Sequence, residues 1–233
     1  MARFTLLLLA TLILTVLPAS SEAGDVFTGF QIDNEEQYFS YLGVRTPVYR
    51  ISGETKLFAQ ALMAGLGYKF KDNGKLLDAN VQFIVPALGI SHTLGRWTFS
   101  GQVGPQFRRT EQEQRNTSAS IVSQIGAYGQ VEAFYWHEKG SLHAIGSYTD
   151  IDEFFWSRLR GKLLAHKADK GCCAVYAGWD VEAMQNADFR AVRTGPVVEI
   201  PIGKIFLLFR GGYQNSNTFH GGGYGGFELY VGF

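Results

Sequence analysis

The sequence predicts an all-β protein, an antiparallel transmembrane β-barrel of about twelve strands that forms a single domain after a signal peptide. Apolar and polar residues alternate with a period of two along most of the chain, as in strands that separate an apolar from a polar medium. Many of the alternating segments span 11 to 16 residues, whereas strands of soluble sheets usually have about 5–6. The chain ends on GGYGGFELYVGF, in which Phe227, Leu229, Val231 and Phe233 share one face.

Residues 1–23 are expected to form a secretory signal peptide. Arg3 supplies the positive start, Phe4–Leu17 is an apolar run of 14 residues, and small residues precede Gly24, which is the three-part pattern of such signals. The alternative is an N-terminal membrane anchor, but an anchor needs about 20 apolar residues. The residue directly after the expected cleavage point is Gly24 rather than cysteine, which argues against a lipoprotein. Residues 24–233 are then the barrel domain.

Charge and cysteine content exclude several classes of function. Arg3 and Glu22 are the only charges in residues 1–23, so the remainder has 20 basic and 20 acidic residues. This neutral balance predicts no nucleic-acid partner. The two cysteines, Cys172 and Cys173, are expected to be buried or lipid-facing thiols, with a vicinal disulfide as the alternative. Their spacing does not resemble a metal site, and no cofactor is expected.

Turn-forming residues separate the first six predicted strands. Asp33-Asn34 ends the first strand, residues 72–74 (DNG) end the third and Gly95 ends the fourth. Val48–Lys56 joins the second and third strands and is longer than a periplasmic turn should be. The polar stretch Glu111–Ser120 separates the fifth from the sixth. These strands are Asp25–Asp33, Gln37–Pro47, Leu57–Phe70, Ala79–Leu94, Arg96–Thr110 and Ile121–Trp136.

The last six strands are bounded in the same way. Lys139-Gly140, Ala168–Gly171, Gln185-Asn186 and Ile202-Gly203 are short turns, and Asn215–Gly221 is a longer polar connection. These strands are Ser141–Asp150, Phe154–His166, Cys172–Met184, Phe189–Pro201, Lys204–Gln214 and Gly222–Phe233. An even number of strands places both termini at the same end of a barrel, which predicts that both are periplasmic.

Alternation assigns a set of charged residues to the inner face. In the eighth strand, for example, Arg158 and Arg160 alternate with Leu159 and Gly161. Two interpretations remain open: a salt-bridge network that fills a small barrel, or a polar path for a solute or polymer. The residues predicted to line the lumen are Glu132, Arg158, Arg160, Asp180, Glu182, Arg193, Glu199, Arg210 and Glu228.

The ending predicts how the barrel closes and assembles. The last strand should pair with the first, because an unpaired edge is not tolerated in lipid. Phe233 then faces lipid at the periplasmic rim, and outer-membrane barrels commonly end on such an aromatic residue. We therefore expect Phe233 to act as a signal for the barrel-assembly machinery. Trp97 and Trp136 are expected near the periplasmic rim, and Trp156 near the outer rim or at the pore mouth.

No catalytic constellation is predicted. Lipid-modifying barrels use a Ser–His pair with an orienting acid or amide. His143 and Ser147 share a strand face but lie about 13 Å apart along it, which is too far for direct contact. His220 lies in a turn whose neighbours match no such motif. We therefore expect no catalytic residue.

Four segments together resemble the BcsS-type cellulose biosynthesis proteins. They are YFSYLGV (Tyr38–Val44) after VFTGFQ, the block GSYTDIDEFFWSRLRGKLL (Gly146–Leu164), RTGPVVEIPIG (Arg193–Gly203) and GGYGGFELYVGF. The resemblance covers most of residues 24–233, but its motifs are diffuse glycines and aromatics at strand positions. The chain departs from the pattern around Pro47–Lys56 and at Cys172-Cys173.

The resemblance implies an outer-membrane barrel that supports cellulose export or display, with a glucan chain or cellulose-secretion components as partners besides lipid. It implies no catalytic residues. A glucan path would use aromatic platforms, for which Tyr135, Trp136, Trp156 and Tyr176 are candidates, although interfacial girdles also explain such residues. The alternatives are a small general porin, a structural barrel, a lipid-modifying enzyme and a soluble periplasmic sandwich.

Overall fold

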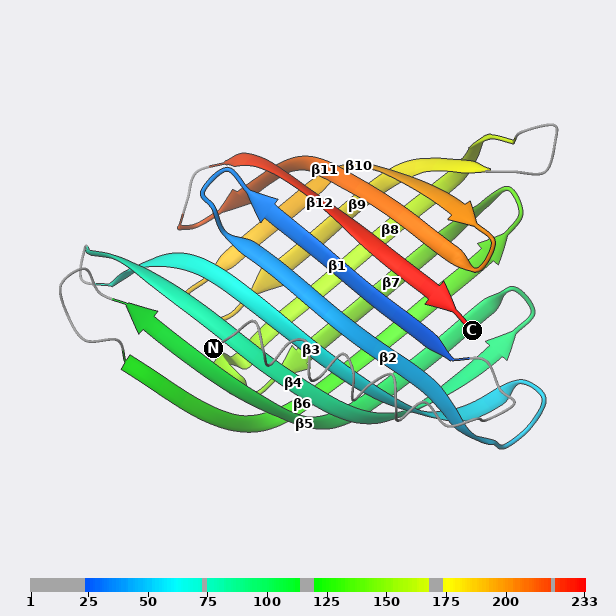
Figure 1. Cartoon of the computed structure of the whole chain (residues 1–233), viewed down its shortest axis with the longest axis horizontal. Coiled ribbons are helices and arrows are strands. Elements are labelled where there is room, and N and C mark those ends of the chain that lie inside the picture. Colours follow the sequence, from blue (N-terminus) through cyan, green and yellow to red (C-terminus); the bar gives the residue numbers. More distant parts are fainter. Residues whose placement is uncertain (1–23, 73–74, 114–119, 168–173, 219–220) are drawn as a thin grey trace.

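The chain forms a closed barrel of twelve antiparallel strands (Figure 1). The computed structural model describes residues 24–72, 75–113, 120–167, 174–218 and 221–233. One short 3-10 turn, η1 (Ile151–Glu153), interrupts the strands. The strands are β1 (Asp25–Asp33), β2 (Tyr38–Arg50), β3 (Thr55–Asp72), β4 (Lys75–Leu94), β5 (Trp97–Glu113), β6 (Ser120–His137), β7 (Gly140–Thr149), β8 (Phe154–His166), β9 (Val175–Gln185), β10 (Arg190–Ile202), β11 (Ile205–Ser216) and β12 (Gly222–Gly232).

The barrel closes between its first and last strands. β1 pairs with β12 from Asp25 opposite Gly232 to Asp33 opposite Tyr224, and with β2 on its other side. No strand of the ring is therefore left with an open edge, which is the condition for strands to cross a bilayer. This closure confirms the predicted fold and excludes the soluble sandwich. We call the end of the barrel that holds Asp25 and Gly232 the terminal end, and the opposite end the far end.

Several strand limits differ from the prediction. β2 and β3 extend toward each other, so that residues 51–54 alone connect them. This hairpin contains a register shift between Pro47 and Tyr49, because proline cannot donate a ladder hydrogen bond. Its turn is held by the Ile51 amide, which donates to the Thr55 carbonyl at 2.9 Å. The long connection predicted over Val48–Lys56 is therefore wrong.

Some predictions fall outside the described residues. They concern the signal peptide over residues 1–23, Cys172 and Cys173 at the predicted start of the ninth strand, and His220. β9 is described from Val175.

The outer face of the barrel is apolar and exposed. Ile125, Leu163 and Val103 are 74%, 72% and 69% exposed. Removing each such side chain from water would be favourable by about 1.5–3 kcal/mol. Trp97 lies on this face at the terminal end, with its ring 5.1 Å from that of Tyr135. A continuous apolar belt with rim aromatics is typical of a lipid-facing barrel. None of the helical segments described is long and apolar enough to cross a bilayer.

Candidate functional site: the barrel lumen

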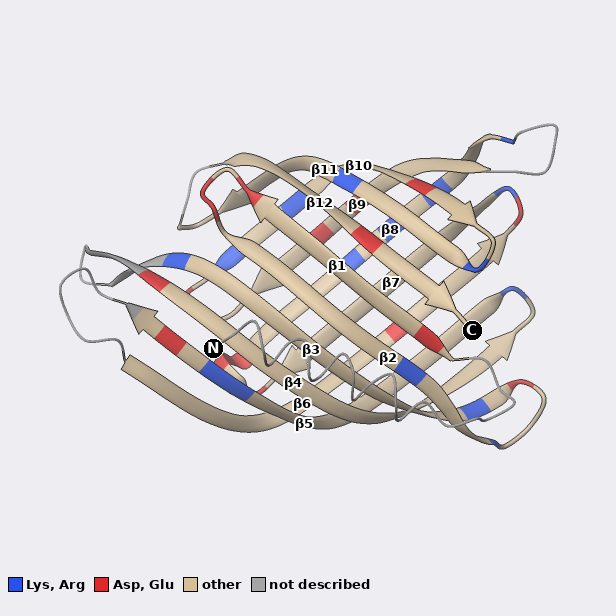
Figure 2. Ribbon diagram, in the orientation of Figure 1, with Lys and Arg blue, Asp and Glu red and all other residues tan. Residues whose placement is uncertain are grey.

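Alternation along the strands places all nine sequence-predicted lumen residues on the inner face. Eight of them line the central cavity, and Asp180 lies fully buried beside it. Figure 2 shows charges in the middle of β8 to β12, whereas in β1 to β6 most charges lie nearer the strand ends. The charges thus gather on one side of the lumen rather than around its whole circumference.

Glu228 on β12 is hydrogen-bonded to arginines of β8 on the other side of β9 to β11. It accepts hydrogen bonds from Arg158 Nη1 at 2.9 Å, and from Arg160 Nη1 and Nη2 at 2.9 and 2.7 Å. Arg210 Nη1 also donates to it, at 3.4 Å. Three strands separate β8 from β12 around the ring, so these bonds span the lumen. We call Arg158, Arg160 and Glu228 the first crossbar.

Other charges pack behind the first crossbar, against β9 to β11. Asp180 Oδ2 accepts from Arg160 Nε and Nη2 at 3.0 and 2.7 Å, and Glu182 accepts from Arg210 Nη1 at 2.6 Å. Arg193 lies 4.0 Å from Glu182. These side chains form the salt-bridge network that was one of the two interpretations of the sequence.

Two further acid–base contacts extend the network. Lys162 pairs with Glu199. Arg193 also lies 4.0 Å from Asp33 at the end of β1.

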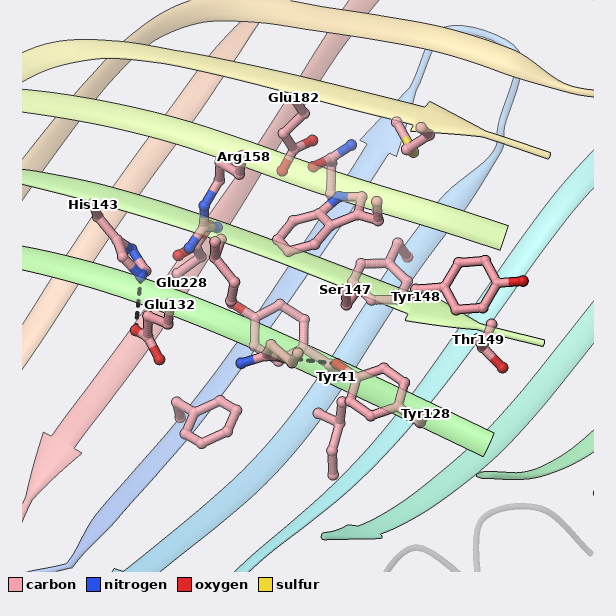
Figure 3. Close-up of a pocket in the computed structure, with 18 of the residues that line it drawn as sticks. Tyr41, Tyr128, Glu132, His143, Ser147, Tyr148, Thr149, Arg158, Glu182 and Glu228 are labelled. Atoms are coloured by element: carbon pink, nitrogen blue, oxygen red, sulfur yellow. Dashed lines mark hydrogen bonds and ion pairs between the residues drawn. The ribbon is translucent and has the colours of Figure 1, made fainter. Parts of the chain in front are cut away.

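A second crossbar links β2 to β6. Arg45 Nη2 donates to Glu132 Oε2 at 3.1 Å, and the other carboxylate oxygen lies 2.7 Å from His143 Nε2 (Figure 3). Ser100 Oγ also donates to Glu132, at 3.3 Å. Three strands again lie between β2 and β6. Arg45 and Glu132 are the second crossbar, and the guanidinium of Arg45 also lies 4.8 Å from the centroid of the Phe58 ring.

Arg45, His143, Asp33 and Lys162 are lumen residues that are not among those predicted from the sequence. Applying the period of two to the second and seventh strands would have placed Arg45 and His143 on the inner face, because Arg45 shares a face with Tyr41 and His143 with Ile145 and Ser147. Their pairing with Glu132 carries no sequence signal, since the three residues lie on three different strands.

The crossbars divide the lumen into two packed sides and a central slot. Behind the first crossbar lie β9 to β11, where Asp180, Val197 and Leu208 are buried, and behind the second lie β3 to β5, where Phe58 and Val85 are buried. Other side chains of these strands, such as Phe83 and Phe206, still line parts of the cavity. Between them, the inner faces of β12, β1 and β2 look across to β6, β7 and β8. Inner-face side chains there remain partly exposed, among them Phe27, Tyr41, Tyr128, Gln130, Ser147 and Tyr230.

The slot is part of a cavity of about 1910 Å³. Its lining includes Asp25 and Trp136 at the terminal end, and Gln37 and Asn217 at the far end. Pockets for single small molecules usually measure about 300–1,000 Å³. The cavity therefore has the extent of a passage along the barrel rather than of one ligand pocket.

The charges of the crossbars and of the salt-bridge network balance. The cations Arg45, Arg158, Arg160, Lys162, Arg193 and Arg210 face the anions Asp33, Glu132, Asp180, Glu182, Glu199 and Glu228. A lumen with paired charges gives little net attraction for either sign of ion, but it presents many donors and acceptors.

The four predicted aromatic platforms have different positions. Trp156 and Trp136 line the cavity, and the guanidinium of Arg158 lies 5.6 Å from the centroid of the Trp156 ring. Tyr176 is buried at the terminal end, where it donates to the Glu138 carbonyl. Tyr135 faces outward beside Trp97. Trp136 is thus a lumen residue at the rim rather than a lipid-facing girdle residue, because it shares the inner face of β6 with Glu132 and Phe134.

The described lumen presents side chains suited to hydrogen bonding rather than to metal binding. No group of three or more His, Cys, Asp or Glu side chains within the described ranges is placed to hold a metal ion. The one histidine in the slot, His143, has its Nε2 on Glu132 and its ring edge-on to Phe134, at 5.7 Å between centroids. This arrangement can orient and hold a polar solute.

Comparison with known proteins supports the fold. No family model matches the sequence, and no curated protein matches it significantly. Among solved structures, the translocator domain of the autotransporter NalP from Neisseria meningitidis is similar, at 14% identity over 96% of this chain and 92% of that one, with a TM-score of 0.54. The transport unit of the autotransporter AIDA-I from Escherichia coli has 8% identity, 93% and 91% coverage and a TM-score of 0.54.

An outer membrane channel from Pseudomonas putida F1 is also similar. It has 13% identity, 94% coverage of this chain and 97% of its own, and a TM-score of 0.51. At these identities the likeness concerns the fold, which is that of outer-membrane β-barrels.

Proposed function

We propose that this chain is a non-catalytic outer-membrane barrel whose lumen supports export or surface display of a neutral exopolysaccharide, with cellulose as the polymer. The central slot is the observation that supports the proposal. The cavity that contains it is lined by residues from both ends of the barrel, and the charges of the lumen are paired. A neutral polymer gains nothing from a net field, but its hydroxyl groups need donors and acceptors along the path. The exposed apolar belt supports a place in the outer membrane, and the resemblance to the BcsS-type proteins supplies the choice of cellulose.

A catalytic role has less support in the same lumen. A nucleophilic mechanism needs a base within hydrogen-bond reach of the nucleophile, about 2.6–3.2 Å. Across the described part of the chain, the close partner of His143 is the Glu132 carboxylate, while Ser100 Oγ is bound to that same carboxylate. Ser100 and His143 thus both contact the Glu132 carboxylate instead of forming a nucleophile–base pair with each other.

The experiment is an in-frame deletion strain in which glucan is measured separately in the medium, on the cell surface and in the periplasm. We expect surface glucan to fall while synthesis continues or periplasmic glucan accumulates. Expression of the wild-type chain should restore the surface pool. Unchanged amounts in all three pools would contradict the proposal.

A small general porin is the second candidate, and the extent of the cavity along the barrel favours it. Conductance recordings of the reconstituted barrel separate the two functions when combined with the deletion strain. A porin would conduct salt and admit small solutes without any change in the glucan pools. Arg158→Ala together with Arg160→Ala tests either passage, since we expect altered conductance or secretion from a barrel that still assembles.

A further inference from the structure

Five aromatic side chains follow one another along one wall of the slot. Phe206 at the terminal end of β11 lies 5.8 Å from Tyr230, and Tyr230 is the cross-strand partner of Phe27. The Phe27 ring lies 6.3 Å from Tyr41, and Tyr41 lies 5.6 Å from Phe39, near the start of β2 at the far end. We call these five residues the aromatic track.

The track faces the cavity rather than a packed core. All five rings line the cavity, and each remains partly exposed. Aromatic side chains that only filled the barrel would be expected to be fully buried, as Phe58 is at 3% exposed. The track instead runs where the two crossbars leave space, from one end of the lumen toward the other.

Two glycines hold rings of the track against the wall. The Tyr41 ring lies over Gly29 on β1, where a Cβ atom would come within 2.6 Å of it. The Phe27 ring lies over Gly43 on β2, and a Cβ atom there would also collide with the ring. Rings seated on glycine backbone project less into the lumen, so they line the slot without filling it.

The opposite wall carries neutral hydrogen-bonding groups among its side chains. Tyr128 donates from its hydroxyl to Gln130 Oε1 at 2.6 Å, and both residues line the cavity together with Ser147 (Figure 3). Hydroxyl and amide groups can donate as well as accept hydrogen bonds. One wall of the slot therefore presents the aromatic track, while the facing wall presents neutral hydrogen-bonding groups beside apolar side chains such as Ile145 and Trp156.

We propose that the aromatic track is a binding path for an unbranched chain of neutral pyranose sugars. The C–H faces of a pyranose ring carry slight positive charge and stack on the negative faces of aromatic rings, and the hydroxyl groups at its edge then reach Tyr128, Gln130 and Ser147 on the facing wall. Charged polymers are disfavoured, because the crossbar charges are already paired. This inference rests on the proposed passage of a polysaccharide, and it assigns the residues that hold the chain.

The test measures binding of cellohexaose, maltohexaose and an anionic oligogalacturonate to the full barrel, folded in detergent, by isothermal titration calorimetry. We expect the wild type to bind at least one neutral hexaose more tightly than the anionic oligomer. Phe27→Ala and Tyr41→Ala should each weaken that binding about two- to tenfold. The matched control is Phe83→Ala, which removes a ring that lines the cavity from β4, and it should leave binding within about twofold.

Heat-modifiable migration on gels establishes that each variant is folded, and Tyr41→Phe should bind as the wild type does. If Tyr41→Ala does not fold, Phe27→Ala and Phe206→Ala carry the test. Absence of neutral-hexaose binding by the wild type, or an equal loss in Phe83→Ala, would overturn the track. The comparison of cellohexaose with maltohexaose shows which linkage the track prefers.

The outcomes separate this inference from the proposed function. If the glucan pools of the deletion strain change but the barrel binds no neutral hexaose, the track is wrong and the export role stands. If the pools are unchanged but hexaose binding depends on the track, the barrel is a saccharide-binding channel and the cellulose role is wrong.

Discussion

Glu228→Gln is the substitution that most directly tests the first crossbar. Glu228 accepts four hydrogen bonds from three guanidinium groups, those of Arg158, Arg160 and Arg210. Glutamine keeps one acceptor oxygen but replaces the other with an amide that donates. Whichever way the amide is turned, its nitrogen faces guanidinium donors that lie 2.7–3.4 Å from the original oxygens.

The expected cost follows from the charge left behind. In the wild type, Arg158, Arg160, Arg193 and Arg210 are balanced by Asp33, Asp180, Glu182 and Glu228; the substitution leaves four cations and three anions. Breaking a buried ion pair by removing one partner costs about 3–5 kcal/mol. Because the side chain of Glu228 is 16% exposed, we expect about 3 kcal/mol, the lower end of that range.

The assay is reversible urea unfolding of the barrel in lipid vesicles, with Glu153→Gln as the matched control. Glu153 lies in η1 at the far end and is exposed, and surface substitutions of this kind usually change stability by less than about 0.5 kcal/mol. Adding Arg158→Gln to Glu228→Gln restores the balance and should recover part of the loss. If Glu228→Gln is as stable as the control, the crossbar does not hold β8 and β12 together.

Three other changes test other parts of the barrel. Arg45→Ala removes the second crossbar and should raise the single-channel conductance. The control Arg109→Ala, on the outer face of β5, should leave it unchanged. If Arg45→Ala conducts as the wild type does, the crossbar does not narrow the slot. Gly178→Ala places a Cβ atom against the backbone of β8, so it should lower the free energy of unfolding by about 1–3 kcal/mol in urea titrations. Gly53→Ala is the control, because a Cβ atom at Gly53 meets open space. Phe233→Ala should reduce the heat-modifiable, folded fraction in outer-membrane preparations if Phe233 is an assembly signal, and an unchanged fraction would remove that role.

The sequence predicts the strands and their faces well because one physical rule governs both. Each strand must present apolar side chains to lipid, so the period of two persists through β8 and β9 and marks Arg158, Arg160, Asp180 and Glu182 as inward-facing. The limits of β1 and β8 follow directly from the residues that flank them. The sequence predicts that the second strand ends at Pro47. In the structure, β2 accommodates Pro47 at a register shift and its pairing with β3 continues to Arg50.

The crossbars could not be predicted, because they join strands that are neighbours neither in the sequence nor in the sheet. Alternation places Glu228 and Glu132 inside the barrel but does not say which cation reaches them across the lumen. That choice depends on strand tilt and stagger, which a closed barrel fixes only as a whole. Trp136 illustrates the same limit at the rim, since an aromatic residue there can face lipid or lumen.

The charges of the lumen argue for a slot that stays open. Replacing a buried ion pair by apolar side chains of equal volume is often neutral or stabilising by about 1–4 kcal/mol, so a lumen that needed only to be filled would gain nothing from charge. The side at β3 to β5 contains uncharged filling, namely the fully buried Val85 and the buried amides of Gln60, Gln102 and Gln106. Four of the five crossbar residues, Arg45, Glu132, Arg158 and Glu228, instead retain 24%, 17%, 10% and 16% side-chain exposure, while Arg160 is 4% exposed. Charged side chains that are paired but remain in contact with the cavity can brace the two walls at a fixed separation and keep the slot polar, which is what the passage of a hydroxyl-rich chain requires.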